Sequence, residues 1–342
     1  MVQSLARCRS CGVPRELAEN CIWTGAGGIA LRSFRGNRVA MIGDRAIDIF
    51  WEKLVSSGVN EALLSREKNV MRHFSADSMA GIRGKVTRFG AVKKRALEAI
   101  EGLCAVLGLG KVEVERFSPG EMASILLVKP LNPWLLAAGI VGILEGLDNI
   151  SYDYRLLEAG KGDQRLILEY SGEDNRNADD INDRPDLPEY IPGTVLDTCD
   201  CCGLPLDLEE FKWDELYGTI KTANGVHRMA FLPRPVLQIM ANAPNDGSGE
   251  SGLLEEAIYL STVEQSGQRI PDEDIARILA LRGWGRIDEA HRKDRSWRIS
   301  IFQPVDTSMI AGWLRGLYTI EVGKEPHLSL VFRYEAAFYE LD

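Results

Sequence analysis

The sequence lacks the features that mark membrane and secreted proteins. Its longest apolar run extends from Trp134 to Leu144, whereas a helix that crosses a bilayer needs about 20 apolar residues. The N-terminus has no apolar stretch typical of a signal peptide. Seven cysteines in 342 residues do not form the dense, even-numbered framework of small disulfide-bonded proteins. We therefore expect a cytoplasmic protein with no membrane span.

Positive charge is also scarce. The chain has 40 Lys and Arg against 50 Asp and Glu, for a net charge of −10. Proteins that bind nucleic acid non-specifically present a basic face, so this balance argues against a nucleic-acid partner. Apolar residues make up 45% and charged residues 26% of the chain, as in ordinary globular proteins. The length is sufficient for two or three domains.

Common catalytic motifs are missing as well. The four histidines are dispersed, and none forms a His-x-x-x-His pair. The glycines of residues 25–28 fall in a predicted hairpin, and no Gly-Lys-Ser/Thr follows them, so they do not form a phosphate-binding loop. No Gly-x-Ser-x-Gly nucleophile elbow occurs. We therefore expect a protein that is not an enzyme.

What the sequence does contain is one motif present twice. Cys8-Arg-Ser-Cys11-Gly-Val-Pro14 recurs as Cys199-Asp-Cys201-Cys202-Gly-Leu-Pro205, with both cysteine positions displaced by 191 residues. Farther along, Trp23 is matched by Trp213, and residues 36–42 resemble residues 225–232. A repeat of this kind indicates a duplicated structural unit. We therefore interpret the chain as two related halves.

The repeated cysteines suggest a metal site. A Cys-x-x-Cys-Gly turn directs two thiolates toward one point, and two such turns complete a tetrahedral zinc shell, as in zinc ribbons. If the halves pack about a pseudo-twofold axis, Cys8, Cys11, Cys199 and Cys202 hold one structural Zn²⁺. Three alternatives stay open, namely an iron–sulfur cluster, redox-active dithiols and metal-free pairs.

The other three cysteines are not expected to bind metal. Cys21 aligns with Phe211, which favours a small core residue. Cys201 aligns with Ser10 inside the turn, and Cys104 lies on the apolar face of a predicted helix.

Hydrophobic periodicity predicts the same order of elements in both halves. Each half begins with a zinc-ribbon-like knuckle and a hairpin, continues with helices, and ends in a strand–strand–helix–strand–strand tail. The predicted tail of the first half comprises strands 111–117 and 122–128, helix 134–147, and strands 152–157 and 165–170. The predicted class is α/β (α+β), with antiparallel strands and packed helices. We expect a first repeat at 1–170, an acidic linker at 171–198 and a second, shorter repeat at 199–342.

The tail of the first half resembles a known family. Val128-Lys-Pro130-Leu-Asn132-Pro133 is followed by the small-residue stretch Ala138–Gly146. This pattern resembles the 4-vinyl reductase domain, a small-molecule-binding α/β domain related in fold to a subunit of the TRAPP vesicle-tethering complex. The match is weaker in the second half, where Asp306-Thr307 replaces Asn132-Pro133.

The resemblance implies a sensory or accessory protein that binds a small hydrophobic molecule in a cleft between helices and sheet. Candidate cleft residues are Phe117, Trp134, Leu135 and Trp313, for which core packing is the alternative. A second hypothesis is an accessory or structural subunit that binds a protein partner and no ligand. A third is a thiol-redox or iron–sulfur protein. Glycines 139, 142 and 146, with glycines 312 and 316, allow close helix packing and also leave an oligomer open.

Overall fold

The computed structural model describes most of the chain, in nine segments: 6–32, 34–79, 90–118, 121–148, 150–172, 190–243, 252–265, 270–293 and 295–342. The predicted acidic linker falls largely outside these residues, because 173–189 are not described. The chain divides into two compact units. Unit 1 comprises Met1–Leu5, Glu61–Pro185 and Trp213–Lys221, and unit 2 comprises Ala6–Asn60, Asp186–Lys212 and Thr222–Asp342. Each unit thus contains residues from both halves of the sequence.

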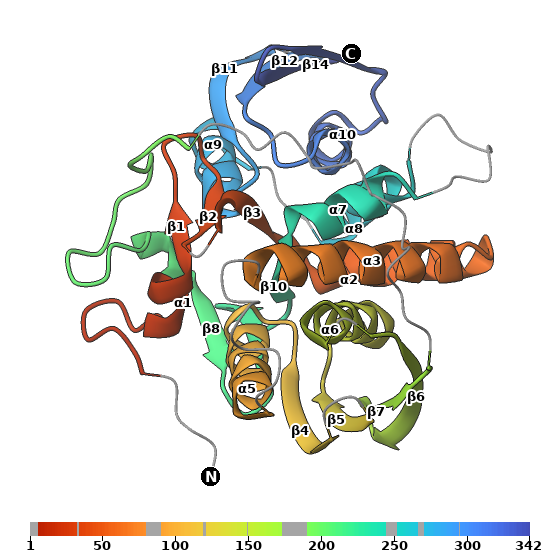
Figure 1. The fold of residues 1–342 in the computed structure, drawn as a ribbon. Coiled ribbons are helices and arrows are strands. Elements are labelled where there is room, and N and C mark those ends of the chain that lie inside the picture. The colour runs from red at the N-terminus through yellow and green to blue at the C-terminus, as the bar shows by residue number, and fades with distance from the viewer. Residues whose placement is uncertain are drawn as a thin grey trace. The chain divides into compact units, whose positions relative to one another are not determined.

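Unit 1 is built on the tail of the first half. Its elements are α3 (Asn60–Met79), α5 (Gly90–Val106), β4 (Lys111–Ser118), β5 (Met122–Val128), α6 (Pro133–Asp148), β6 (Tyr152–Gly160) and β7 (Asp163–Tyr170). The strands form an antiparallel sheet in the order β4-β5-β7-β6, and α6 lies against it (Figure 1). Ala123, Ile125 and Leu127 alternate with less buried residues along β5 and enter the core. This period of two is what a strand with one buried face requires.

Unit 2 repeats this order with the tail of the second half. Its corresponding elements are α8 (Leu253–Gln265), α9 (Asp272–Leu281), β11 (Arg286–Lys293), β12 (Ser296–Phe302), α10 (Thr307–Val322), β13 (Leu328–Arg333) and β14 (Ala336–Leu341). The sheet order is β11-β12-β14-β13, again antiparallel, with α10 beside it (Figure 1). The predicted mixed α/β class with antiparallel sheets is therefore confirmed.

The turn before the central helix is the same in both tails. Lys129 and Gln303 have φ angles of 47° and 46°, a left-handed conformation that residues other than glycine rarely adopt. Asn132 Oδ1 then accepts hydrogen bonds from the backbone N–H groups of Trp134 and Leu135, at 3.1 and 3.0 Å. In the second tail, Asp306 caps α10 in the same way. Asn and Asp suit this position because their side chains satisfy N–H groups at the start of a helix.

The remaining elements belong mainly to the first part of each half. They are α1 (Arg15–Asn20), β1 (Cys21–Trp23), β2 (Ile29–Leu31), β3 (Phe34–Gly43), α2 (Asp44–Ser56), the 3₁₀ helix η1 (Leu206–Glu210), β8 (Phe211–Asp214), β9 (Thr219–Thr222), β10 (Arg228–Pro233) and α7 (Arg234–Ala241). In unit 2, strands β1, β2, β3 and β10 pair antiparallel in that order. The hairpin of β8 and β9 lies mostly in unit 1.

The two hairpins are exchanged between the halves. In unit 2, the indole Nε1–H of Trp23, on the first-half hairpin, donates to the carbonyl oxygen of Leu281 in the second half at 3.0 Å. In unit 1, Trp213 from the second half donates in the same way to Val106 of the first half, also at 3.0 Å. Each unit therefore combines the hairpin of one half with the tail of the other.

Two glycine contacts accompany this exchange. The N–H of Gly285 donates to the carbonyl of Gly27, and the N–H of Gly110 donates to the carbonyl of Gly218, both at 3.0 Å. A Cβ on Gly27 would lie 2.5 Å from the oxygen of Gly285, and one on Gly218 would lie 2.7 Å from the carbonyl carbon of Gly110. Only glycine permits so close an approach of two backbones.

Candidate metal centre

The two cysteine turns have the same backbone hydrogen bonds. In the first turn, the N–H of Cys8 donates to Val13 at 2.9 Å and the N–H of Gly12 donates back to Cys8 at 3.0 Å. In the second turn, Cys199 and Gly203 make the equivalent bonds, both at 2.8 Å. These bonds hold the backbone of each turn in a tight loop that presents its two cysteine side chains together.

The glycine after each pair has a conformational role. Gly12 and Gly203 have φ angles of 71° and 73°, in the left-handed region that costs a residue with a Cβ about 1–2 kcal/mol. A Cβ at either position would meet no atom within 4 Å. The glycine of the Cys-x-x-Cys-Gly motif is therefore required by backbone conformation and not by lack of space.

The four repeated cysteines converge on one point. The sulfurs of Cys8 and Cys199 lie 3.7 Å apart, those of Cys11 and Cys202 lie 3.6 Å apart, and all four lie within 4.8 Å of one another. All four residues belong to unit 2. A tetrahedral zinc site with Zn–S bonds of about 2.3 Å has sulfur–sulfur edges of about 3.8 Å. The predicted meeting of the two pairs is confirmed, with dimensions that suit a metal ion.

Peptide N–H groups favour the charged form of the first cysteine in each pair. Backbone hydrogen bonds from Cys11 and Ser10 lower the pKa of Cys8 to about 6. The backbone of Cys202, and then that of Cys201, lower the pKa of Cys199. Because metals bind the thiolate, each turn is preorganised to supply at least one ligand.

The second cysteine of each pair is in a different electrostatic setting. Burial raises the pKa of Cys11 and raises that of Cys202 to about 12. A cation at the centre of the four sulfurs would counter this penalty, because a coordinated thiol loses its proton.

The remaining cysteines differ from these four. Cys21 and Cys104 are buried, and burial raises the pKa of each to about 12, so both are neutral core thiols. Cys201 is exposed, and its interaction with Cys8 raises the pKa of the Cys201 thiol. None of the three belongs to the group of four in the part of the chain that the structure describes.

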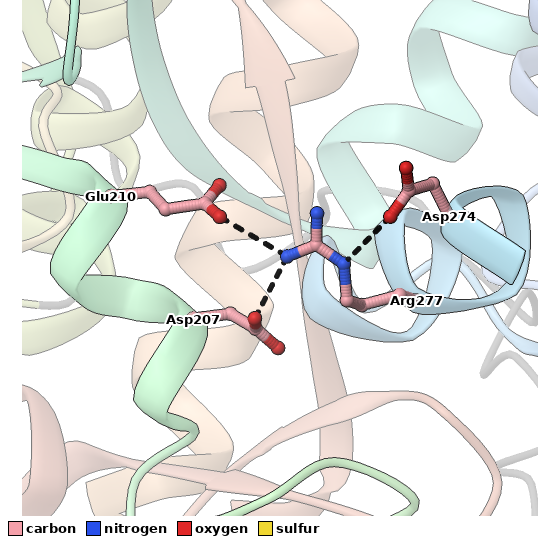
Figure 2. A network of polar contacts seen from close by, with 4 residues as sticks. All are labelled: Asp207, Glu210, Asp274 and Arg277. Atoms are coloured by element: carbon pink, nitrogen blue, oxygen red, sulfur yellow. Dashed lines mark hydrogen bonds and ion pairs between the residues drawn. The ribbon is translucent and has the colours of Figure 1, made fainter. Parts of the chain in front are cut away.

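An ion-pair network anchors the chain that leaves the second turn. Arg277 of α9 donates through Nη1 to Asp207 at 2.7 Å and to Glu210 at 3.2 Å, both on η1. Its Nε donates to Asp274 at 3.2 Å (Figure 2). The network lies within unit 2 and ties η1, which begins four residues after Cys202, to the body of that unit. Its groups are partly exposed, so its contribution to stability is modest.

The candidate ligand residues are distributed over both units. Phe117 on β4 packs against the core of unit 1, where Leu135 is buried and Trp134 is 42% exposed at the start of α6. Trp313 lies in unit 2, where it is buried and meets Trp284 edge-on, with ring centroids 5.8 Å apart. Trp313 is therefore packed in a core of unit 2.

Sequence reasoning did not single out two buried acids of unit 1, Glu67 and Glu145. Glu67 on α3 is 4% exposed and its Oε2 has no hydrogen-bond partner among the described residues. Glu145 on α6 is fully buried, and its Oε1 accepts from Lys68 Nζ at 3.2 Å and from the N–H of Tyr152 at 3.0 Å. Burial raises the pKa of Glu67 well above its usual value. Glu145 was visible as an acid within a small-residue helix, whereas Glu67 stands among other charges and gave no signal.

Comparison with known proteins identifies no match. No family model, no curated protein and no solved structure matches the chain. Among the described residues, no helix is both long enough and apolar enough to cross a membrane.

Proposed function

We propose that Cys8, Cys11, Cys199 and Cys202 bind one Zn²⁺ with a structural role. The observation that carries this proposal is the convergence of the four sulfurs within 4.8 Å. Two edges of the sulfur tetrahedron, at 3.7 and 3.6 Å, are close to the value of about 3.8 Å derived from Zn–S bond lengths. The ion would join the start of the first half to the start of the second.

The same spacing favours a single ion over a multinuclear cluster. In an iron–sulfur cluster the cysteines bind different irons, so their sulfurs lie farther apart than the ligands of one ion do. A mononuclear iron site shares the tetrahedral geometry, and elemental analysis separates it from zinc. We expect about one zinc per chain in freshly purified protein, which would also be colourless. A zinc content well below one per chain would contradict the shared site.

Four protein ligands also favour a structural site over a catalytic one. A catalytic zinc keeps one position open for water or substrate, whereas a structural zinc is closed by four side chains. The protein is accordingly proposed to be a non-catalytic binding protein whose metal stabilises the fold.

The ligand proposed for it is a small, mainly apolar molecule bound in the tail of the first repeat. The observation that favours a ligand is the unpaired Oε2 of Glu67, since an unsatisfied buried polar atom costs about 1–3 kcal/mol. A ligand with an apolar body and one hydrogen-bonding group would recover this cost, and Phe117 and Leu135 stay the proposed apolar contacts. Native mass spectrometry of freshly purified protein tests this, with an added mass expected for the wild type and lost in Glu67→Leu. A wild-type spectrum at the bare mass of protein plus metal would count against it.

A second candidate function is that of an accessory subunit, and strand β13 favours it. β13 is the last strand of its sheet, and Leu330, Val331 and Phe332 on it are 42%, 47% and 59% exposed. Edge strands with apolar side chains pair readily with an added strand. Under this proposal a protein partner copurifies with the wild type and is lost in Phe332→Lys, with Tyr334→Lys in the adjacent turn as the control. Equal recovery with all three proteins would contradict it.

A further inference from the structure

The hairpin of β11 and β12 in unit 2 carries a groove lined by polar residues. Its volume is about 530 Å³, and the residues that line it are His291, Lys293, Arg295, Ser296 and Arg298. Three of these five are Lys or Arg, whereas the chain as a whole has a net charge of −10. The proposed metal site and the proposed apolar ligand use none of them.

The strand register gathers these side chains on one face of the hairpin. His291 lies opposite Arg298, and Lys293 lies opposite Ser296. Residues two apart in a strand point to the same face, with about 7 Å between them, and opposite residues are about 5 Å apart. The cationic groups therefore form a compact cluster and not a long track. Asp294, in the turn of the hairpin, lies outside the described residues.

The opposite face of the hairpin is fastened to α10. Trp297 is fully buried, and the guanidinium carbon of Arg292 lies 4.0 Å from its ring centroid. Arg292 also forms an ion pair with Glu321 of α10. The hydroxyl of Tyr318, on the same helix, donates to the carbonyl oxygen of Arg295 at 2.9 Å. The end of the hairpin is thus held in place by its buried face, while its cationic face stays in solvent.

The equivalent hairpin of unit 1, formed by β4 and β5, lacks this cluster. Counted from the turn, Ser118 with Met122 and Arg116 with Ser124 in unit 1 correspond to Lys293 with Ser296 and His291 with Arg298 in unit 2. Two of the cations are therefore serines in unit 1. Ser124 moreover donates to the carboxylate of Glu115 at 2.9 Å, so an acid lies beside its position. Because the two tails have the same fold, the fold itself does not require positive charge at this site.

The acids near the groove do not cancel its charge. Arg298 donates to Glu340 of β14 at 2.8 Å, but the two side chains are 70% and 49% exposed. Glu289, two positions before the groove on β11, is exposed as well. Within the part of the chain that the structure describes, the side chains of Lys293 and Arg295 have no ion-pair partner. Their charges are therefore available to a ligand.

We propose that this groove binds a small molecule through its phosphate groups. Arginine forms paired hydrogen bonds with phosphate oxygens, lysine adds a point charge, and the hydroxyl of Ser296 supplies a further donor. The volume lies within the range of about 300–1,000 Å³ found for small-molecule sites. A nucleic acid would need a longer basic surface than this cluster offers. The site is additional to the proposed metal and apolar-ligand sites and depends on neither.

The test is a calorimetric titration of the full-length protein with inorganic pyrophosphate at about 50 mM salt, where exposed charges are weakly screened. We expect the wild type to bind about one pyrophosphate per chain. Lys293→Ser and Arg298→Ser give the hairpin the residues that unit 1 has at the equivalent positions. Each should raise the Kd at least about fivefold.

Arg155→Ser is the matched control. Arg155 is also an exposed arginine, paired with Glu169 on the neighbouring strand at 3.1 Å, and its loss changes the net charge by the same amount. We expect its Kd to stay within about twofold of the wild-type value. Urea denaturation of each variant verifies that a loss of binding is not a loss of folding.

Several results would overturn the inference. One is the absence of binding to the wild type at millimolar pyrophosphate, and another is equal weakening by Arg155→Ser and Lys293→Ser. Pyrophosphate also binds metal ions, so the zinc content is measured before and after the titration. Heat that persists in Lys293→Ser while zinc is lost would assign the signal to the metal and not to the groove. Tighter binding of a single-stranded oligonucleotide than of pyrophosphate would make the partner a nucleic acid.

Discussion

The indole Nε1–H of Trp23 donates a hydrogen bond to the carbonyl oxygen of Leu281 at 3.0 Å, although 258 residues separate them. Trp213 and Val106 form the same bond at the same length in the other unit. Trp23 and Trp213 are both nearly buried. The two tryptophans therefore match in structural role as well as in sequence, and each anchors a hairpin to a tail.

Replacing either tryptophan with phenylalanine tests this anchor. Trp23→Phe and Trp213→Phe keep most of the ring but leave a buried carbonyl without its donor, which costs about 1–3 kcal/mol. We expect each variant to lower the free energy of unfolding by that amount in urea denaturation. Trp134→Phe, at a half-exposed position, serves as the control and should change it little. Equal effects in all three would mean that ring packing alone matters.

The paired glycines predict that alanine destabilises the protein more at crowded glycine positions than at open ones. Gly27 and Gly218 have positive φ and no space for a Cβ, whereas Gly225 has positive φ with no atom within 4 Å. Gly225→Ala should therefore cost only the conformational penalty of about 1–2 kcal/mol. Gly27→Ala and Gly218→Ala should cost a further ~1–3 kcal/mol from overpacking. Thermal and chemical denaturation of the three variants measure this, and an equal loss at Gly225 and Gly27 would refute the close-contact explanation.

The shared metal site predicts equal consequences for both turns. Cys11→Ser and Cys202→Ser each remove one of four ligands, so each should lower the zinc content and destabilise the protein by several kcal/mol, given that structural zinc contributes on the order of 10 kcal/mol in isolated peptides. Elemental analysis and denaturation of purified variants provide the readout. Cys201→Ser, which leaves the four ligands intact, should retain full zinc. If only one of the two ligand variants lost metal, the pairs would not share an ion.

Glu67 predicts a pH dependence of stability. Burial raises its pKa well above the ordinary 4.5, so the folded protein holds this proton more tightly than the unfolded chain does. The tighter proton binding of Glu67 in the folded protein stabilises it fully below the unfolded-state pKa. This stabilisation is lost as the pH rises through the raised folded-state pKa. Glu67→Gln cannot ionise and should remove this decline.

Urea denaturation of wild type and Glu67→Gln across a pH series measures the effect. The two proteins should have similar free energies of unfolding near pH 4, within about 1 kcal/mol. The Gln variant should become the more stable one as the pH rises to neutrality and above. Parallel pH profiles would show that the carboxyl ionises as freely in the folded protein as in the unfolded chain.

Local patterns predicted the parts of the fold that depend on local chemistry. The period of two in residues 122–128 and the small-residue run at 134–147 correspond to β5 and α6. The duplicated Cys-x-x-Cys-Gly motif predicted that the two pairs of sulfurs would meet, because half a tetrahedral shell in each turn is incomplete alone. The metal that they bind stays a prediction.

The exchange of hairpins could not be predicted in this way. Periodicity shows that Trp23 has a buried side, but it does not show which of two similar tails accepts the indole N–H, since Leu281 and Val106 offer the same carbonyl. Burial of individual aromatic residues is equally ambiguous in sequence. Trp134 and Trp313 were both candidates for a ligand cleft, yet one is half-exposed and the other lies in a core. The resemblance to the 4-vinyl reductase domain and the ligand that it implies stay predictions.

The exchange of Trp23 and Trp213 between tails has a consequence for biosynthesis. Residues 213–221 are part of unit 1, so the ribosome must translate well past the first half before that unit has all of its chain. Until then, the tail surface that receives this hairpin is unprotected and open to a wrong partner, a general risk for intermediates of large proteins. A fragment ending at the linker should consequently be poorly soluble when produced alone, and it should be rescued when residues 190–342 are produced in the same cell.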